Sequence, residues 1–517
     1  MLGRVDPQGS LLETRQIRKH LITKGSFYER LADYGHELFK DDDYAHLYSS
    51  RMGRPSIPPS VMIRAMLCAT NDNIHSDVET SRRTRVDADW KAAMGVDDEF
   101  EGIGATTFAL MRSRMVATEA DNRPFEATLI KAVDAGVLKG NVTAIVDSSP
   151  IHGAGAVADT YELIRGFLKK AIKAAGKDIS NDTLAGAGPH LGSKPEIDWQ
   201  DPQARRQHLV DLVKVARQVV SEIDPQNVRA VEAAGLLAQV VEQDTEPDEQ
   251  GNPKIRRGVA RDRVISHSDP EMRHGRKSPT RRFNGHKMDV LTDESSELVL
   301  AVEVRAGNAG DGAGALPLVE QANQIEGVQI ETVLGDMAYS EGDVRVEIEQ
   351  AGAKLIAKVP PVSNQGRYPK TEFDIDTSAG TVTCPAGETT TTSKKAKDHK
   401  GHPGLMFVFS AQVCNACPLH DLCIKPTQSK GRSIFVGRHH DRITAARKAQ
   451  EDPEIKALLR CRSKVERKID HLQDLGAKKA RYRGRRKTRL QVRLAAAVAN
   501  FKRLGVLGAF ETQVQAG

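Results

Sequence analysis

Hydrophobic residues recur every three to four positions through much of residues 1–120, and this spacing is typical of amphipathic helices. After Pro58, which suits a helix start, apolar side chains stand at Val61, Met66 and Leu67. The polar positions between them carry many arginines. The pattern therefore predicts an N-terminal all-α domain over residues 1–120.

Between residues 140 and 360, short β-branched runs replace the helical spacing. The runs at 142–146, 331–335 and 354–359 predict buried strands, and a helical stretch separates the last two. A strand, a helix and a second strand in succession are typical of a parallel pair. We therefore expect an α/β domain with a mixed sheet over 140–360. Its first strand is predicted to end at Asp147, because Ser-Ser-Pro follows.

A second helical pattern interrupts this core at about 160–260. Residues 202–223 and 225–243 carry apolar residues at helical spacing and predict a helical hairpin. The Gly-rich stretch 180–194 predicts a loop before the hairpin. This part of the chain is expected to be a helical insertion in the α/β core.

From residue 361 to residue 452 the helical spacing fades, and Thr, Ser, Gly and Lys become frequent, which predicts a β-rich insertion. Four of the six cysteines fall within 40 residues of this stretch: Cys384, Cys414, Cys417 and Cys423. One Cys-x-x-Cys with two more thiolates suits a structural, tetrahedral Zn²⁺ site, with His420 as an alternative ligand. Unrelated cysteines are the other interpretation, but a segment this polar needs a metal to hold a fold.

Helical spacing returns over residues 453–510, where a helix at 462–472 and a closing helix at 490–504 are predicted. Between the two helices, eight of the twelve residues 478–489 are cationic and none is acidic. Solvated helix faces seldom reach this density without interleaved acids. We therefore interpret the segment as one that binds phosphates.

Three acids stand at the ends of these predicted elements. Asp147 and Asp336 each follow a strand, and Glu466 lies on the helix at 462–472, close to its apolar face. Two strand-end acids in one sheet can converge on a divalent metal, and the helix can bring a third. The alternative for Asp147 alone is an acid that only stabilises a turn.

Asp147, Asp336 and Glu466 together resemble the Asp-Asp-Glu set of the DDE transposases of bacterial insertion sequences. The similarity extends to the Gly285-x-Lys287 strand and to the Arg-x-x-x-Glu core formed by Arg462 and Glu466. It also includes the corner at Gly307, Asn308 and Asp311, and it covers residues from about 50 to about 505. Leu459 stands where the family has Tyr, and Gln473 stands where it has Lys.

The resemblance implies a ribonuclease-H-like mixed sheet and two Mg²⁺ (or Mn²⁺) ions held by Asp147, Asp336 and Glu466. It implies cleavage at the element's terminal inverted repeats and joining of the freed 3′-hydroxyls to target DNA. Asp269 is interpreted as structural or substrate-positioning and not as a metal ligand. The cysteine-rich insertion stands where the family places one, but Trp90 and Trp199 both lie outside it, so a Trp-dependent DNA hairpin is not supported.

The net charge of +6 is small for 517 residues, so only the local distribution of cations indicates nucleic acid. Candidate phosphate contacts lie in the N-terminal helices, in a basic strip before the Gly-x-Lys strand, and near and after Glu466. They are Arg82, Arg83, Arg112, Arg276, Lys277, Lys287, Arg462, Lys478, Lys479, Arg481, Arg483, Arg485 and Arg486. For any one arginine, a solvated surface is the alternative.

No apolar run is long enough for a membrane span, and the first residues show no secretory signal. Six cysteines in such a chain favour a reducing compartment. The resemblance implies a bacterial cytoplasmic, nucleoid-associated protein. The expected partner is double-stranded DNA, both inverted repeats and target, bound by a homodimer that pairs two ends. The alternatives are a domesticated, non-catalytic DNA-binding protein and a nuclease that cuts without joining.

Overall fold

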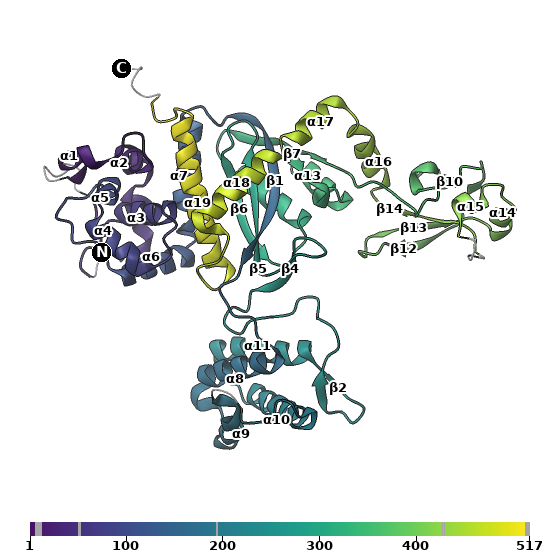
Figure 1. Cartoon of the computed structure of the whole chain (residues 1–517), viewed down its shortest axis with the longest axis horizontal. Coiled ribbons are helices and arrows are strands. Elements are labelled where there is room, and N and C mark those ends of the chain that lie inside the picture. The colour runs from purple at the N-terminus through teal and green to yellow at the C-terminus, as the bar shows by residue number, and fades with distance from the viewer. Residues whose placement is uncertain (6–12, 50–52, 193–194, 426–427, 429, 512–517) are drawn as a thin grey trace.

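The computed structural model describes residues 1–5, 13–49, 53–192, 195–425, 428 and 430–511. A central sheet carries helices on both sides, and three further parts of the chain extend from it (Figure 1). The N-terminal helices lie at one end, a β-rich segment lies at the other, and a helical segment lies below the sheet in this view. In the described part of the chain, no helix combines the length and apolar character of a membrane span.

In the described residues, the central sheet is mixed and six-stranded, with the order β4-β5-β1-β7-β8 and with β6 paired to β5. Its strands are β1 (Gly140–His152), β4 (Arg273–Arg276), β5 (Arg282–Asp293), β6 (Val299–Ala306), β7 (Val328–Gly335) and β8 (Lys354–Ala357). β5 runs antiparallel to β1, whereas β7 is parallel to β1 and β8 is parallel to β7. The mixed α/β sheet predicted from the sequence is confirmed.

β1 does not end at Asp147, as the sequence predicted, but continues to His152. It stays paired with β5 as far as the His152–Gly285 pair, whereas its pairing with β7 stops at Ile145. Beyond Ile145 only one edge of β1 is paired along its length, so Pro150 stands where a missing N–H is tolerated. Pairing with β5 thus outweighs the turn propensity of Ser-Ser-Pro.

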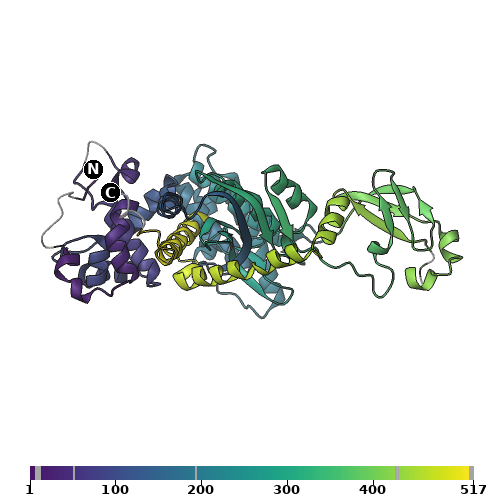
Figure 2. The same cartoon turned by 90° about the horizontal axis from the view of Figure 1, so that it is seen from above.

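Helices α12 (Ala315–Ala322) and α13 (Gly342–Gln350) provide the connections between β6, β7 and β8. Helix α18 (Ser463–Leu472) packs on β1 and β5 through Val465, Ile469 and Leu472, all buried. Seen from above, the sheet lies with helices on either side of it (Figure 2).

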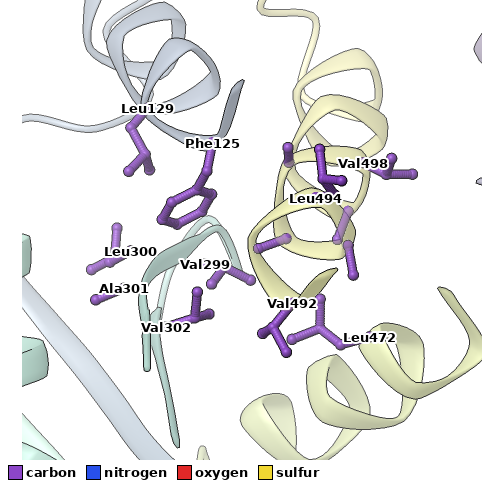
Figure 3. Close-up of a cluster of buried hydrophobic side chains, with 14 of the residues drawn as sticks. Phe125, Leu129, Val299, Leu300, Ala301, Val302, Leu472, Val492, Leu494 and Val498 are labelled. Atoms are coloured by element: carbon purple, nitrogen blue, oxygen red, sulfur yellow. The ribbon is translucent and has the colours of Figure 1, made fainter. Parts of the chain in front are cut away.

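Helix α19 (Arg485–Val506) is buried on most of its surface, because it packs between the N-terminal helices and β6. Its side chain Val492 lies beside Leu472 on the side toward β6, whereas Val498 points to the opposite side of the helix (Figure 3). The N-terminal helices are α2 (Phe27–Leu38), α3 (Pro59–Asn71), α4 (Asp77–Val86), α5 (Ala88–Met94), α6 (Ala105–Ala117) and α7 (Arg123–Asp134), preceded by the short α1 (Thr14–Ile17). One hydrophobic core therefore joins the N-terminal helices, the sheet and α19.

The helical segment has a separate core. It consists of α8 (Thr160–Ala175), α9 (Asn181–Leu191), α10 (Pro202–Ser221) and α11 (Val228–Asp244), followed by the hairpin β2 (Thr245–Pro247) and β3 (Pro253–Ile255). α9 lies where the Gly-rich sequence predicted a loop, so that prediction was wrong. The Ser180 side chain caps this helix by accepting a hydrogen bond from Thr183 N, and Ala187 is buried in the core.

The β-rich segment holds two antiparallel three-stranded sheets among the described residues. One consists of β9 (Asp374–Asp376), β10 (Thr381–Thr383) and β11 (Thr389–Thr390), and the other of β12 (Ser393–Lys397), β13 (Pro403–Val408) and β14 (Ser433–Gly437). The short helices α14 (Ala411–Asn415) and α15 (His420–Cys423) follow β13. Helices α16 (His440–Ala449) and α17 (Pro453–Arg460) then lead back to the central sheet.

Candidate active site

Asp147 and Asp336 come from neighbouring strands of the central sheet. Ile145 of β1 pairs in parallel with Leu334 of β7. The same register, carried on by two residues, places Asp147 beside Asp336, the first residue after β7. The Asp336 carboxylate accepts a hydrogen bond from Ala338 N at 2.7 Å, which fixes it at the start of a short helical turn.

Glu466 lies in the first turn of α18, and its side chain is 59% exposed. Arg462, one turn earlier, forms an ion pair with Glu466 at 3.4 Å. Helix α18 packs across β1, and the charges of Arg462 and Glu466 both act on Asp147 of that strand. Gln473, after the end of α18, donates a hydrogen bond to Ser149 Oγ at 2.8 Å and ties the helix to β1.

The pKa of Asp147 shows how these groups act on one another. The pKa of Asp147 is raised to about 6, mainly by burial and also by repulsion from Asp336 and Glu466, while the Ser148 N–H and Arg462 oppose the rise. A bound cation would relieve the repulsion that Asp336 and Glu466 exert on Asp147. In the described residues Asp147 accepts one hydrogen bond, from Ser148 N at 2.7 Å, so lone pairs remain for that cation.

No three His, Cys, Asp or Glu side chains in the described ranges stand in an arrangement ready to hold a metal ion. The donors at Asp147, Asp336 and Glu466 are carboxylate oxygens, which are the ligands that Mg²⁺ and Mn²⁺ prefer. The mutual repulsion that raises the pKa of Asp147 is also the electrostatic condition that a divalent ion relieves.

A buried polar network supports this site. Lys287 Nζ donates to Asp311 at 2.6 Å and to the Ala309 carbonyl at 2.7 Å, and Ser148 Oγ donates to Asp311 at 2.7 Å. Lys287 is therefore tied to the protein, and a DNA phosphate that reaches it competes with Asp311. The sequence placed Asp311 at a corner but did not predict its link to Ser148.

Two more buried groups beside the acids were missed by the sequence interpretation. Asp289 on β5 is fully buried and forms a two-point ion pair with Arg305 of β6. Tyr339 is also fully buried, and its hydroxyl has no hydrogen-bond partner within the described residues. Burial raises the pKa of Tyr339, and the charges of Asp289 and Asp147 add to this effect. The sequence offered one signal for each group: Asp289 follows Lys287 closely in the chain, and Tyr339 follows Asp336 closely.

The candidate phosphate contacts fall into two classes in the structure. Several are held by nearby acids or carbonyls: Arg82 and Arg83 by Glu79, Arg112 by Asp77, Arg481 by the His75 carbonyl, Arg485 by Glu271, and Arg486 by the Val116 carbonyl. The others that are exposed, without such a partner in the described part of the chain, are Arg276, Lys277, Lys478, Lys479 and Arg483. The exposed cations leave charge free for DNA. Arg481 and Arg486, in contrast, connect the basic segment 478–489 to the N-terminal helices.

The four cysteines of the β-rich segment lie near one another. Burial raises the pKa of the Cys423 thiol, and the thiols of Cys414, Cys384 and Cys417 raise it further. Leu419 N donates to Cys417 Sγ at 3.4 Å, and Arg432 N donates to Cys414 Sγ at 3.5 Å. Backbone N–H groups that point at sulfur stabilise thiolates, which are the form that binds a metal.

Two protein-family models match parts of the chain. A transposase DDE domain matches residues 383–505, which include Arg462 and Glu466. A transposase domain (DUF772) matches residues 16–114, which are the N-terminal helices. Both matches support an insertion-sequence DDE transposase. No curated protein and no solved structure matches it.

Transposases bind DNA, and DDE domains cleave it with divalent metals such as Mg²⁺. The matched DDE region contains the α18 acid but neither Asp147 nor Asp336. The sheet register and the electrostatic coupling are therefore what connect those two acids of this transposase to Glu466.

Proposed function

We propose that this transposase cuts DNA at the terminal inverted repeats of its insertion sequence and joins the freed 3′-hydroxyls to target DNA. Asp147, Asp336 and Glu466 are the catalytic acids. The proposal depends most on one observation: Asp336 and Glu466, from different parts of the chain, both act on the half-buried Asp147 carboxylate, which follows the β1 segment paired with β7. Arg462, which partly offsets this repulsion, is positioned to brace Glu466 or to contact a phosphate.

When bound, two Mg²⁺ (or Mn²⁺) ions would activate the attacking water or hydroxyl and stabilise the leaving 3′-oxygen. In this proposal Asp147 would be a ligand of both ions, and Asp336 and Glu466 would each be a ligand of one. The network of Ser148, Asp311 and Lys287 holds β1 in position beneath them.

We assign the central sheet to the ribonuclease-H-like class. The strand order supports this assignment: β6, β5 and β1 are antiparallel to their neighbours, and the parallel strands β7 and β8 follow. The positions of the two acids, on β1 and directly after β7, support it as well. In this scheme residues 1–120 bind DNA, residues 140–360 and 453–510 form the catalytic core, and the segments 160–260 and 361–452 are insertions.

The DNA partner is double-stranded, and a homodimer on paired ends would bring both repeats to two active sites in the bacterial cytoplasm. Lys478, Lys479 and Arg483 support phosphate binding beside the core, because they are exposed and lie in or just after the segment that pairs with His152 at the end of β1.

The test uses DNA that carries the inverted repeats flanking the gene, incubated with the protein and Mg²⁺. The expected result is cleavage at the repeat boundary and joining of the 3′-hydroxyl to a second DNA, both measured on sequencing gels. Cleavage without joining would identify a nuclease. Repeat binding without cleavage would identify a domesticated DNA-binding protein.

We also propose a structural Zn²⁺ site formed by Cys384, Cys414, Cys417 and Cys423. Their mutual effect on the Cys423 thiol and the two N–H···S hydrogen bonds support this proposal. His420 remains the alternative ligand.

Purified protein is expected to contain about one zinc per chain by elemental analysis. Cys417→Ser should lose that zinc and lower the unfolding temperature of the β-rich segment, because metal binding supplies folding free energy there. Cys461→Ser is the matched control, since Cys461 lies outside the group at the end of α17. Equal zinc content in both variants would contradict the site.

A further inference from the structure

A cavity of about 410 Å³ lies where the β-rich segment meets the central sheet. The start of α13 forms one side, and β9, β14 and α16 form the others. His439 Nε2 lies 2.7 Å from Asp343 Oδ1 on α13, and Arg442 pairs with Glu349 at 3.1 Å. A side chain on Gly342 would overlap His439, so the two parts approach closely here.

Three basic side chains line one part of this cavity. Lys370 precedes β9, and His440 and Arg447 lie two turns apart on α16. In the described part of the chain, neither Lys370 nor Arg447 has a carboxylate partner, and the buried Nε of Arg447 has no hydrogen-bond partner. Such a buried guanidinium nitrogen is costly unless an acceptor binds it.

The electrostatics of the three groups support the same interpretation. The pKa of Lys370 is lowered to about 8, mainly by burial and also by the Arg447 charge. The pKa of His440 is lowered to about 4, mainly by burial and also by Lys370 and Arg447, while Asp441 opposes the change. An anion between these groups would remove their repulsion.

The acids that line the cavity do not provide this anion. Asp343 is held by Arg438 and His439, and Asp398 accepts hydrogen bonds from the backbone of its own turn. Asp374 lies exposed on β9.

We propose that this cavity is a phosphate-binding pocket in which Lys370, His440 and Arg447 hold one backbone phosphate of a DNA strand. The proposal rests on the proposed function, because it takes DNA as the substrate. A guanidinium fork with an ammonium nearby is the recognition chemistry of phosphate oxygens. The volume lies in the range of pockets that take small ligands, which leaves room for a phosphate with its sugar.

The surface beside the pocket favours a DNA strand over a free phosphate. Lys397 of β12 pairs with Pro403, which lines the cavity, and Lys394, Lys395 and Lys397 are all exposed. A strand that enters the pocket would run past these lysines, whereas a free phosphate would not need them.

The experiment measures the affinity for repeat DNA as a function of salt for wild type and for the Lys370→Gln/Arg447→Gln double variant. The double variant should bind about tenfold more weakly, because it loses charged hydrogen bonds to one phosphate. Its plot of log affinity against log salt should be less steep by about one. Lys448→Gln is the matched control, because Lys448 is an exposed neighbour on α16 outside the cavity.

The single variants and their unfolding temperatures test whether misfolding causes the weaker DNA binding. Binding of radiolabelled inorganic phosphate tests whether the pocket takes free phosphate instead of a DNA phosphate. Phosphate bound by wild type and displaced by DNA supports the proposal. The proposal is overturned if wild type binds phosphate but the double variant keeps the wild-type DNA affinity and salt-dependence slope. It is also overturned if Lys448→Gln loses as much DNA affinity as the double variant. Wild-type protein that neither binds nor cuts repeat DNA refutes the proposed function instead.

Discussion

Glu466→Gln is expected to lower the rate of DNA cleavage by more than about 10³-fold while repeat binding stays within about twofold. Loss of a single active-site hydrogen-bond donor already costs about 10²–10³ in rate, and this change removes a charged metal ligand. Gln keeps the size of the side chain, so α18 should pack on β1 as before. Single-turnover cleavage of labelled repeat DNA gives the rate, and fluorescence anisotropy gives the affinity.

The matched control is Asp470→Asn, which removes one negative charge from an exposed position one turn further along α18. It should cleave at the wild-type rate. If Glu466→Gln cleaved as fast as wild type, another carboxylate would be the third catalytic acid. If both variants lost cleavage equally, the negative charge of α18 would explain the loss of cleavage. A role of Glu466 as a metal ligand would then not be needed to explain it.

Gly285→Ala is expected to reduce the free energy of unfolding of the central sheet by more than about 3 kcal/mol. Gly285 has a φ of +152°, and a Cβ there would overlap the Ile151 carbonyl and the Gly153 amide. The end of β1 would therefore have to separate from β5, where His152 pairs with Gly285. Denaturant unfolding with hydrogen exchange of the β1 and β5 amides would measure the loss.

Gly235→Ala on α11 provides the opposite comparison. Gly235 is exposed in the middle of the helix, and a Cβ there meets no atom within 4 Å. This change should stabilise the helical segment by about 0.5–1 kcal/mol, because Ala loses less backbone entropy on folding than Gly.

The Gly285→Ala prediction would be contradicted if hydrogen-exchange protection of the β1 amides stayed unchanged. Strands β1 and β5 would then tolerate more separation than the structure indicates.

The sequence predicted the parts of the site that local patterns encode. Asp147, Asp336 and Glu466 each stand beside an apolar run whose period indicates its element, so they were visible one at a time. The links of Asp311 to Ser148 and of Asp289 to Arg305 were not visible, because they depend on how the strands and the loop after them are placed beside one another in the sheet.

The two wrong element predictions have a common physical cause. Ser-Ser-Pro after Asp147 and the glycines around residue 186 are turn signals, and in both places tertiary contacts outweigh them. β5 continues to pair with β1 past Pro150, and α9 is held by its Ser180 cap and by packing against α10. Local propensity is a weak guide where a partner element comes from elsewhere in the chain.

The position of α19 has a consequence for synthesis of the protein. The helix fills the space between the N-terminal helices and β6, and Arg493 forms a buried ion pair there with Asp121 at 2.7 Å. A nascent chain still lacking residues 485–506 leaves both neighbouring surfaces exposed and the Asp121 charge without this partner. Folding of the first helices is therefore completed only after the last ones leave the ribosome, and a truncated translation product lacks a finished core.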